Sequence, residues 1–304
     1  MKNASLLIAI LTSIVGIAQQ DIQITQFSEF QSWYNPAYTN IGQNKICGGL
    51  LGRNQWSGFG GRPNTGLISA QYNIDNLNYV GIQLVNDQIG NFNNTIAKLN
   101  YARSFSTPLM QVTAGIGINF HQSKIGTGYI TPDTPVIDDD AINDNPVNLN
   151  TLDMDFGIRL KSRNVEVGLA SSHLNQGKLN SGTFQHQLQR HYFVYSTYRY
   201  GTRIGALKPA IFGKTDGASL QIDTQVQMEF NNNIIAGLNY RLGDNVSPML
   251  GYRFSNNGIS AAIMYNYGIS TNGLAPYQSG THEIGIRVCF LPVLTPTLWK
   301  HPRI

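Results

Sequence analysis

The last third of the chain alternates apolar with small or polar residues, one after the other, from about residue 190 to residue 290. In the run Leu220–Phe230 one face is largely apolar, and the other face carries Gln221, Asp223, Gln225, Gln227 and Glu229. A period of two is typical of a β-strand with two unlike faces. A closed barrel in a membrane, apolar outside and polar inside, satisfies both faces. A water-soluble β-sandwich also alternates, so this run alone leaves both folds open.

The same alternation recurs along the chain and predicts about fourteen strands of the length that membrane barrels use. They cover residues 46–53, 66–74, 79–87, 95–105, 110–124, 151–160, 165–173, 191–200, 206–214, 219–230, 234–242, 247–254, 259–267 and 282–290. Short connections at one end alternate with longer ones that include residues 54–65, 125–150, 174–190 and 268–281. We therefore predict an all-β fold, a transmembrane outer-membrane β-barrel of antiparallel strands, because a sandwich would not enforce that alternation.

Composition favours the same fold. Only 12% of the residues are charged, while glycine reaches 31 and tyrosine 15 residues. Beyond the N-terminus no apolar run approaches the roughly 20 residues of a membrane-spanning helix. The net charge of +4 is spread without a cluster of lysine or arginine, so we expect no nucleic-acid partner.

The chain divides into four predicted segments. Residues 1–18 have the positive start, apolar centre and small-residue end of a signal peptide, so we expect export to the outer membrane of a Gram-negative cell. Residues 19–45 show no sustained period, and we assign them to a periplasmic lead-in, with a plug in the barrel mouth as the other placement. Residues 46–291 form the barrel, and residues 292–304 form a periplasmic C-terminal tail.

The predicted inward faces carry charges of both signs, among them Asp153, Asp155, Arg159, Glu166, Arg199, Asp223, Glu229, Arg241, Arg253, Glu283 and Arg287. Such a set fits either salt-bridged packing of the lumen or the wall of a wet channel, and we favour packing because neither sign dominates. Tyrosines near strand ends fit an interfacial girdle: Tyr72, Tyr79, Tyr200, Tyr240 and Tyr267.

The two cysteines fall in the first and last predicted strands. Cys47 begins one strand and Cys289 ends the other, both with inward phase, and a closed barrel makes these strands neighbours. A disulfide in the oxidising periplasm is one interpretation, and two unpaired small residues are the other.

Sequence motifs for catalysis are missing. The histidines lack metal-ligand spacing, and there is no Gly-x-Ser-x-Gly motif or phosphate loop. Ser171, Ser172 and His173 are the one candidate set for a hydrolase, which we do not favour. We predict no catalytic, cofactor-binding or metal-binding residues and no cofactor.

Several short motifs, in order, resemble the PorP/SprF family of type IX secretion system outer-membrane proteins. They are Tyr34-Asn35-Pro36-Ala37 after Gln26-Phe27, Arg53-Asn54-Gln55-Trp56 followed by Gly61 and Pro63, Gly168-Leu169-Ala170-Ser171-Ser172-His173-Leu174, and His282-Glu283 in the last strand. Asn54 replaces a glutamine of the family pattern, and Ser172 stands where proline is usual.

The resemblance implies a non-enzymatic barrel in outer-membrane lipid that helps to export or anchor a secreted cargo protein or adhesin with a C-terminal sorting domain. It also implies periplasmic ring or lipoprotein partners and, in gliding bacteria, a role in gliding motility. We expect contacts on the long loops and on residues 21–44, since loops on a rigid scaffold usually carry binding. The alternative is a passive outer-membrane channel or small-solute porin.

Overall fold

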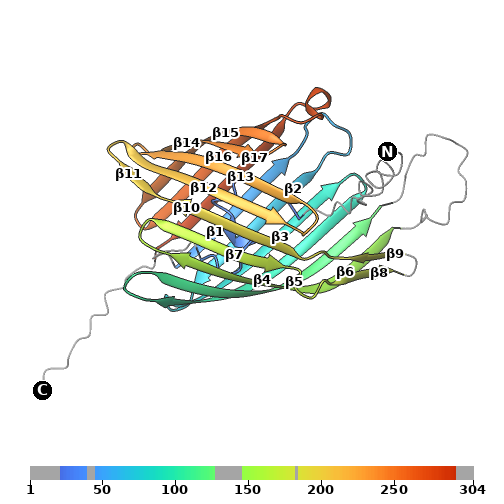
Figure 1. Ribbon diagram of the computed structural model, residues 1–304, viewed down its shortest axis with the longest axis horizontal. Helices are drawn as coiled ribbons and strands as arrows, with labels where there is room; N and C mark the ends of the chain where they lie inside the picture. Colours follow the sequence, from blue (N-terminus) through green and yellow to red (C-terminus); the bar gives the residue numbers. More distant parts are fainter. Residues whose placement is uncertain (1–20, 40–44, 127–145, 182–183, 292–304) are drawn as a thin grey trace, which may run out of the picture.

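The computed structural model describes residues 21–39, 45–126, 146–181 and 184–291. Within them, fourteen antiparallel strands close into a barrel around the N-terminal segment (Figure 1). No helix in these ranges is long and apolar enough to span a bilayer. The predicted signal peptide (1–18) and C-terminal tail (292–304) lie outside the described residues.

The barrel strands follow one another in sequence order, and β1 closes the ring against β17. Their bounds are β1 (Ile46–Asn54), β2 (Asn64–Asn73), β3 (Asn78–Ile89), β4 (Phe92–Ser106), β5 (Gln111–Ile125), β6 (Val147–Lys161), β7 (Val165–Ser172), β10 (His191–Tyr198), β12 (Gly205–Thr215), β13 (Leu220–Phe230), β14 (Ile234–Arg241), β15 (Asn245–Asn256), β16 (Ile259–Ser270) and β17 (Thr281–Phe290). The short β11 (Tyr200–Thr202) extends the β12 edge, and β8 (Lys178–Ser181) pairs with β9 (Phe184–Gln187) as a separate hairpin.

Burial along the strands is the reverse of that in a soluble sheet. Apolar side chains point outward, as in Ile82 and Leu99, both 59% exposed, while Asp223 and Glu283 are fully buried in the lumen. The outward and inward faces assigned from the sequence are confirmed in β13, β14 and β17. This arrangement places the apolar face against lipid and the polar face inside.

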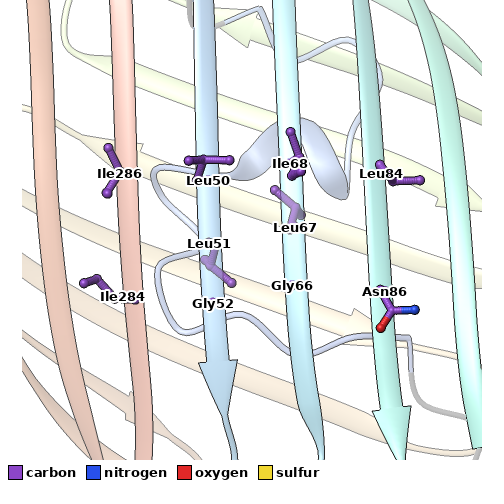
Figure 2. Close-up of a pocket in the computed structure, with 10 residues that line it drawn as sticks. All are labelled: Leu50, Leu51, Gly52, Gly66, Leu67, Ile68, Leu84, Asn86, Ile284 and Ile286. Carbon is purple, nitrogen blue, oxygen red and sulfur yellow. The ribbon is translucent and has the colours of Figure 1, made fainter.

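The outer wall has a shallow depression beside the seam between β1 and β17. Gly52 and Gly66 face each other across β1 and β2 at its floor, and Leu50, Ile68 and Ile286 border it (Figure 2). Because the lining is almost entirely apolar and lies on the lipid-facing wall, acyl chains suffice to fill it.

The connections at the two ends of the barrel differ in length. One end, which we call the turn end, holds residues 74–77, 107–110, 162–164, 203–204, 231–233 and 257–258. The other, the loop end, holds residues 55–63, 173–190 and 271–280, and the connection between β5 and β6 lies mostly outside the described residues. The prediction that short and long connections alternate throughout is wrong, however, because residues 90–91, 216–219 and 242–244 make short turns at the loop end as well.

Residues 21–39 lie inside the barrel, which corrects their assignment to a periplasmic lead-in (Figure 1). Lys214, near the loop end of β12, donates to the carbonyl of Asp21, and Gln71, near the turn end of β2, donates to the carbonyl of Tyr38. The segment therefore runs from the loop end to the turn end, with one 3₁₀ turn, η1 (Gln31–Trp33), on the way. We call residues 21–39 the plug.

Aromatic packing holds one side of the plug. The rings of Phe27 and Tyr34 lie against Phe212 of β12 at centroid distances of 5.2 and 4.7 Å, and Tyr34 also contacts Phe193 of β10 at 5.3 Å. These rings give an otherwise polar lumen a local apolar core. A segment without a regular alternation of apolar and polar residues can be buried in this way, because the strands of the wall provide the apolar and polar partners that surround it.

Tyr79 corrects one further prediction, since it is buried rather than part of an outer girdle. It packs inside the turn end with Ala102 beside Cys47 and Cys289. The other tyrosines predicted for the girdle lie on the outward phase and are exposed or half-buried: Tyr72, Tyr200, Tyr240 and Tyr267.

Cys47 and Cys289 face each other in the register of β1 and β17 and form a disulfide. It joins residues 242 positions apart in the chain, at the strand pair that closes the ring. A cross-link spanning nearly the whole barrel restricts the unfolded chain more than a short one does.

We predict that Cys47→Ser lowers the stability of the barrel by an amount on the order of a few kcal/mol. On gels run without reductant, the boiled natural protein should migrate faster than its reduced form, because the cross-linked chain stays more compact. Cys47→Ser should show no such difference. Equal migration of the natural protein with and without reductant would contradict the pairing.

Candidate functional site

Glu283 of β17 ties the plug to the seam of the barrel. Its carboxylate is fully buried and accepts hydrogen bonds from the backbone amides of Thr25 and Gln26 at 2.9 and 2.8 Å. The Arg53 guanidinium of β1 lies 3.0 Å from the same carboxylate and also donates to the Thr25 hydroxyl. One carboxylate thus joins both closing strands to the plug.

Two more ion pairs lie within the wall, and the basic member of each donates a hydrogen bond to the plug. Lys98 of β4 pairs with Asp155 of β6 at 2.9 Å, donates to the Trp33 carbonyl and lies 4.2 Å from the centre of the Trp33 ring. The Arg241 guanidinium likewise pairs with Asp223 at 2.8 Å and donates to the side-chain oxygen of a plug glutamine, Gln23. Buried charges held in such pairs fit salt-bridged packing of the lumen rather than the wall of a channel.

The Tyr34-Asn35-Pro36-Ala37 motif lies in the plug and is buried throughout. The Asn35 amide donates to the Ile158 carbonyl of β6, and its oxygen accepts from the Ala37 backbone. A Cβ atom at Gly157 would overlap Asn35, and one at Gly115 would overlap the backbone at Ala37. The wall therefore carries glycine where this motif approaches it.

Trp56 and His282 lie near the loop end rather than in the lumen. Residues 55–63 and 271–280 are joined there by backbone hydrogen bonds, from Ser57 N to Gly280 O and from Ser279 N to Ser57 O. Two aromatic side chains on these connections are exposed, Phe59 at 43% and Tyr277 at 71%. His282 points outward and contacts the Tyr265 hydroxyl at 2.7 Å. We call residues 55–63 and 271–280 the paired loops.

The turn end holds a hollow lined by charged residues of the plug and the wall. Glu29 of the plug lies 3.5 Å from Arg287 and 3.8 Å from Arg253. The hollow therefore presents charges of both signs.

The Ser171, Ser172 and His173 set lacks the geometry of a nucleophile and its base. Both serine hydroxyls are buried without a hydrogen-bond partner, so neither is bonded to His173. His173 instead contacts Asp153, and His121 lies beside them. The sequence interpretation missed this grouping because it looked for helical metal spacing, whereas the register of β5 with β6 brings His121 and Asp153 together.

Comparison with protein families identifies the chain. Residues 16–288 match the family described as type IX secretion system membrane protein PorP/SprF. The chain belongs to the PorP/SprF family. Its resemblance to this family, drawn from the short motifs, is confirmed. A search of curated proteins gave no match.

Solved structures with a similar backbone are outer-membrane barrels of low sequence identity. A FadL homologue of Pseudomonas aeruginosa is 9% identical, with a TM-score of 0.50, over 84% of this chain and 92% of that chain. The toluene transporter TbuX of Ralstonia pickettii is 7% identical, with a TM-score of 0.48, over 84% and 90%. The FadL likeness concerns the fold alone. The fold and the family match together show that this PorP/SprF chain is an outer-membrane β-barrel.

We predict that Glu283→Gln destabilises the barrel by about 3–5 kcal/mol, because it leaves the Arg53 charge buried without its partner. The matched control is His282→Ala, a change at the adjacent residue that faces outward, which should cost less than about 1 kcal/mol. Both are measured as denaturant midpoints in detergent. Equal midpoints for the two variants would show that the buried pair does not hold the plug.

Proposed function

We propose that this PorP/SprF barrel is a non-enzymatic, plugged outer-membrane protein that binds a secreted cargo protein or adhesin at the cell surface. The observation that carries the proposal is the occupied lumen: residues 21–39 fill it and are bonded to β4, β6, β13, β14 and β17. A barrel whose interior is filled by its own chain acts through its two end surfaces.

The paired loops are the surface we assign to the cargo. Outer-membrane barrels place their longer connections outside the cell, which puts the loop end at the surface. Exposed aromatic side chains such as Phe59 and Tyr277, held on hydrogen-bonded loops, are suited to bind a protein because they lose little freedom on contact. The cargo class is a protein exported by the type IX system through its C-terminal sorting domain, and in a gliding cell such a cargo would be a motility adhesin.

The hollow at the turn end is the surface we assign to periplasmic partners. It opens on the side where the short connections lie, and its mixed charges, including Glu29, Arg253 and Arg287, favour an electrostatically complementary protein. Periplasmic ring or lipoprotein components of the secretion system are the proposed partners there.

A passive channel or small-solute porin is the second candidate, and the plug argues against it. The hydrolase hypothesis has less support, because Ser171 and Ser172 make no hydrogen bond to His173. The hydrogen bonds that Glu283, Lys98 and Arg241 make to the plug, together with the aromatic contacts, would all have to be lost before the plug left the lumen.

Cargo binding is tested by affinity purification of the protein from its own outer membranes in mild detergent, with mass spectrometry of what accompanies it. We predict that Phe59→Ser with Tyr277→Ser lowers the recovered cargo by about tenfold or more, since each lost aromatic anchor costs on the order of 1–2 kcal/mol. Leu109→Ser is the control, because Leu109 is 82% exposed at the turn end. Undiminished cargo in the double variant would remove the paired loops from the proposal.

The channel alternative is tested by conductance in planar bilayers. We predict no steady conductance for the natural protein and open conductance after deletion of residues 21–39, because the side chains of the wall alone do not fill a fourteen-strand ring. Gel migration with and without heating verifies that the deleted form still folds as a barrel. Steady conductance of the natural protein would favour the channel function instead.

A further inference from the structure

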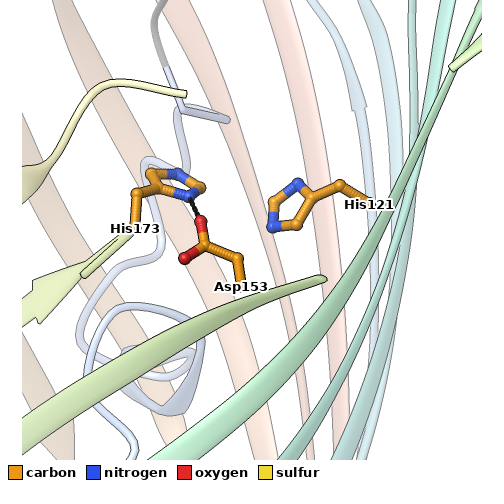
Figure 3. A group of neighbouring side chains, drawn as sticks. All are labelled: His121, Asp153 and His173. Carbon is orange, nitrogen blue, oxygen red and sulfur yellow. Dashed lines mark hydrogen bonds and ion pairs between the residues drawn. The ribbon is translucent and has the colours of Figure 1, made fainter. Parts of the chain in front are cut away.

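Three metal-ligating side chains meet inside the barrel towards its loop end. His121 comes from β5, Asp153 from β6, and His173 is the first residue after β7 (Figure 3). Asn119 pairs with Asp153 in the register of the two strands, so His121 lies two residues further along on the same inward face. All three side chains are more than nine-tenths buried.

One polar atom of this group has no partner in the part of the chain that the structure describes. His121 Nε2 is buried and has no hydrogen-bond partner among the described residues. Its ring faces the carboxylate of Asp153, and the Asp153 carboxylate contacts His173 Nδ1 at 2.5 Å (Figure 3). Buried polar groups nearly always have a partner, so an unpartnered imidazole aimed at a carboxylate indicates a missing ligand.

The donor set and its spacing fit a transition-metal ion. One atom from each side chain can be chosen so that all three lie within 4.8 Å of one another. Zinc binds imidazole nitrogen and carboxylate oxygen at about 2.0–2.2 Å, so small side-chain rotations bring the three atoms into reach of one ion. Two histidines and one carboxylate also leave a position for a fourth ligand.

His191 of β10 lies beside His173, at the edge of the site. Its ring lies 5.7 Å from the ring of His173, centre to centre, and its Nδ1 lies 2.9 Å from the Gln189 carbonyl. A carbonyl oxygen can only accept, so His191 Nδ1 donates to it, and this contact fixes the orientation of the His191 ring beside His173.

We propose that His121, Asp153 and His173 bind one divalent transition-metal ion of the zinc type. The ion would join β5 and β6 to the residue at which the connection 173–190 begins. That connection carries the β8–β9 hairpin and already meets β6 through a hydrogen bond from Leu174 N to Met154 O. Metal binding would therefore stabilise the loop end around this hairpin, whatever cargo the paired loops bind.

The test uses the purified full barrel with a tag that contains no histidine, stripped with a chelator and titrated with Zn²⁺ by calorimetry. We expect about one ion per chain in the micromolar range or tighter and a higher thermal midpoint with zinc. His121→Phe should weaken binding by more than about tenfold and abolish the zinc-dependent rise in midpoint. His282→Phe, which removes an outward histidine, should bind as the natural protein does.

Asp153→Asn is a second ligand variant for the same zinc titration, used if His121→Phe fails to fold as judged by gel migration with and without heating. It removes the carboxylate charge at nearly unchanged volume and should also weaken zinc binding by more than about tenfold. The proposal is overturned if the natural protein binds no zinc, or if the folded ligand variants bind it as tightly as His282→Phe does.

Discussion

The structure depends on the need to fill the space that a ring of fourteen strands encloses. Side chains fill the interior of an eight-stranded barrel, but a wider ring leaves room that its wall cannot occupy. The chain fills this room with its own residues 21–39. The plug brings backbone amides and carbonyls that must be bonded once they leave water, and the wall supplies the partners. Glu283 accepts from Thr25 N and Gln26 N, and Gln225 donates to the Thr25 carbonyl.

Charge pairing follows from the same constraint. The inward face of a membrane barrel is polar because the outward face must be apolar, so the plug meets a wall that already carries charges. Each buried charge costs free energy unless a partner lies close, and the pairs of Arg53 with Glu283 and Lys98 with Asp155 meet that requirement. Removing either member of such a pair is costly. Because Glu283, Arg53 and Lys98 also form hydrogen bonds with the plug, the paired charges hold the plug in one specific position.

Much of the wall could be predicted from sequence because its environment imposes a period. Successive residues of a strand alternate between an outward and an inward side chain, and here lipid lies outside while the interior is polar. Ile234, 39% exposed, points outward and Ile235, 2% exposed, points inward, as that alternation predicts. No such alternation is imposed on the plug. Its surroundings come from many strands at once, so residues 21–39 carry no period, and their pattern did not decide between a lead-in and a plug.

Features that depend on exact register were equally hidden. Tyr79 fits a girdle by its place near a strand end, but its inward phase buries it beside the disulfide. The group of His121, Asp153 and His173 joins three segments far apart in sequence, and only the offset between β5 and β6 brings the first two together. The family resemblance located His173 and Glu283, although it did not say that one belongs to a histidine–carboxylate cluster and the other to the plug contact.

The seam between β1 and β17 is fastened at both ends, and this restricts how the barrel could engage the cargo that we propose. The disulfide of Cys47 and Cys289 closes it at the turn end. Near the loop end, Arg53 pairs with Glu283, and the paired loops are bonded across the same two strands. A wall closed in this way cannot part to release a protein sideways into the membrane without breaking the disulfide and the ion pair. The two end surfaces therefore remain as the places where the proposed partners would bind while the lumen stays filled.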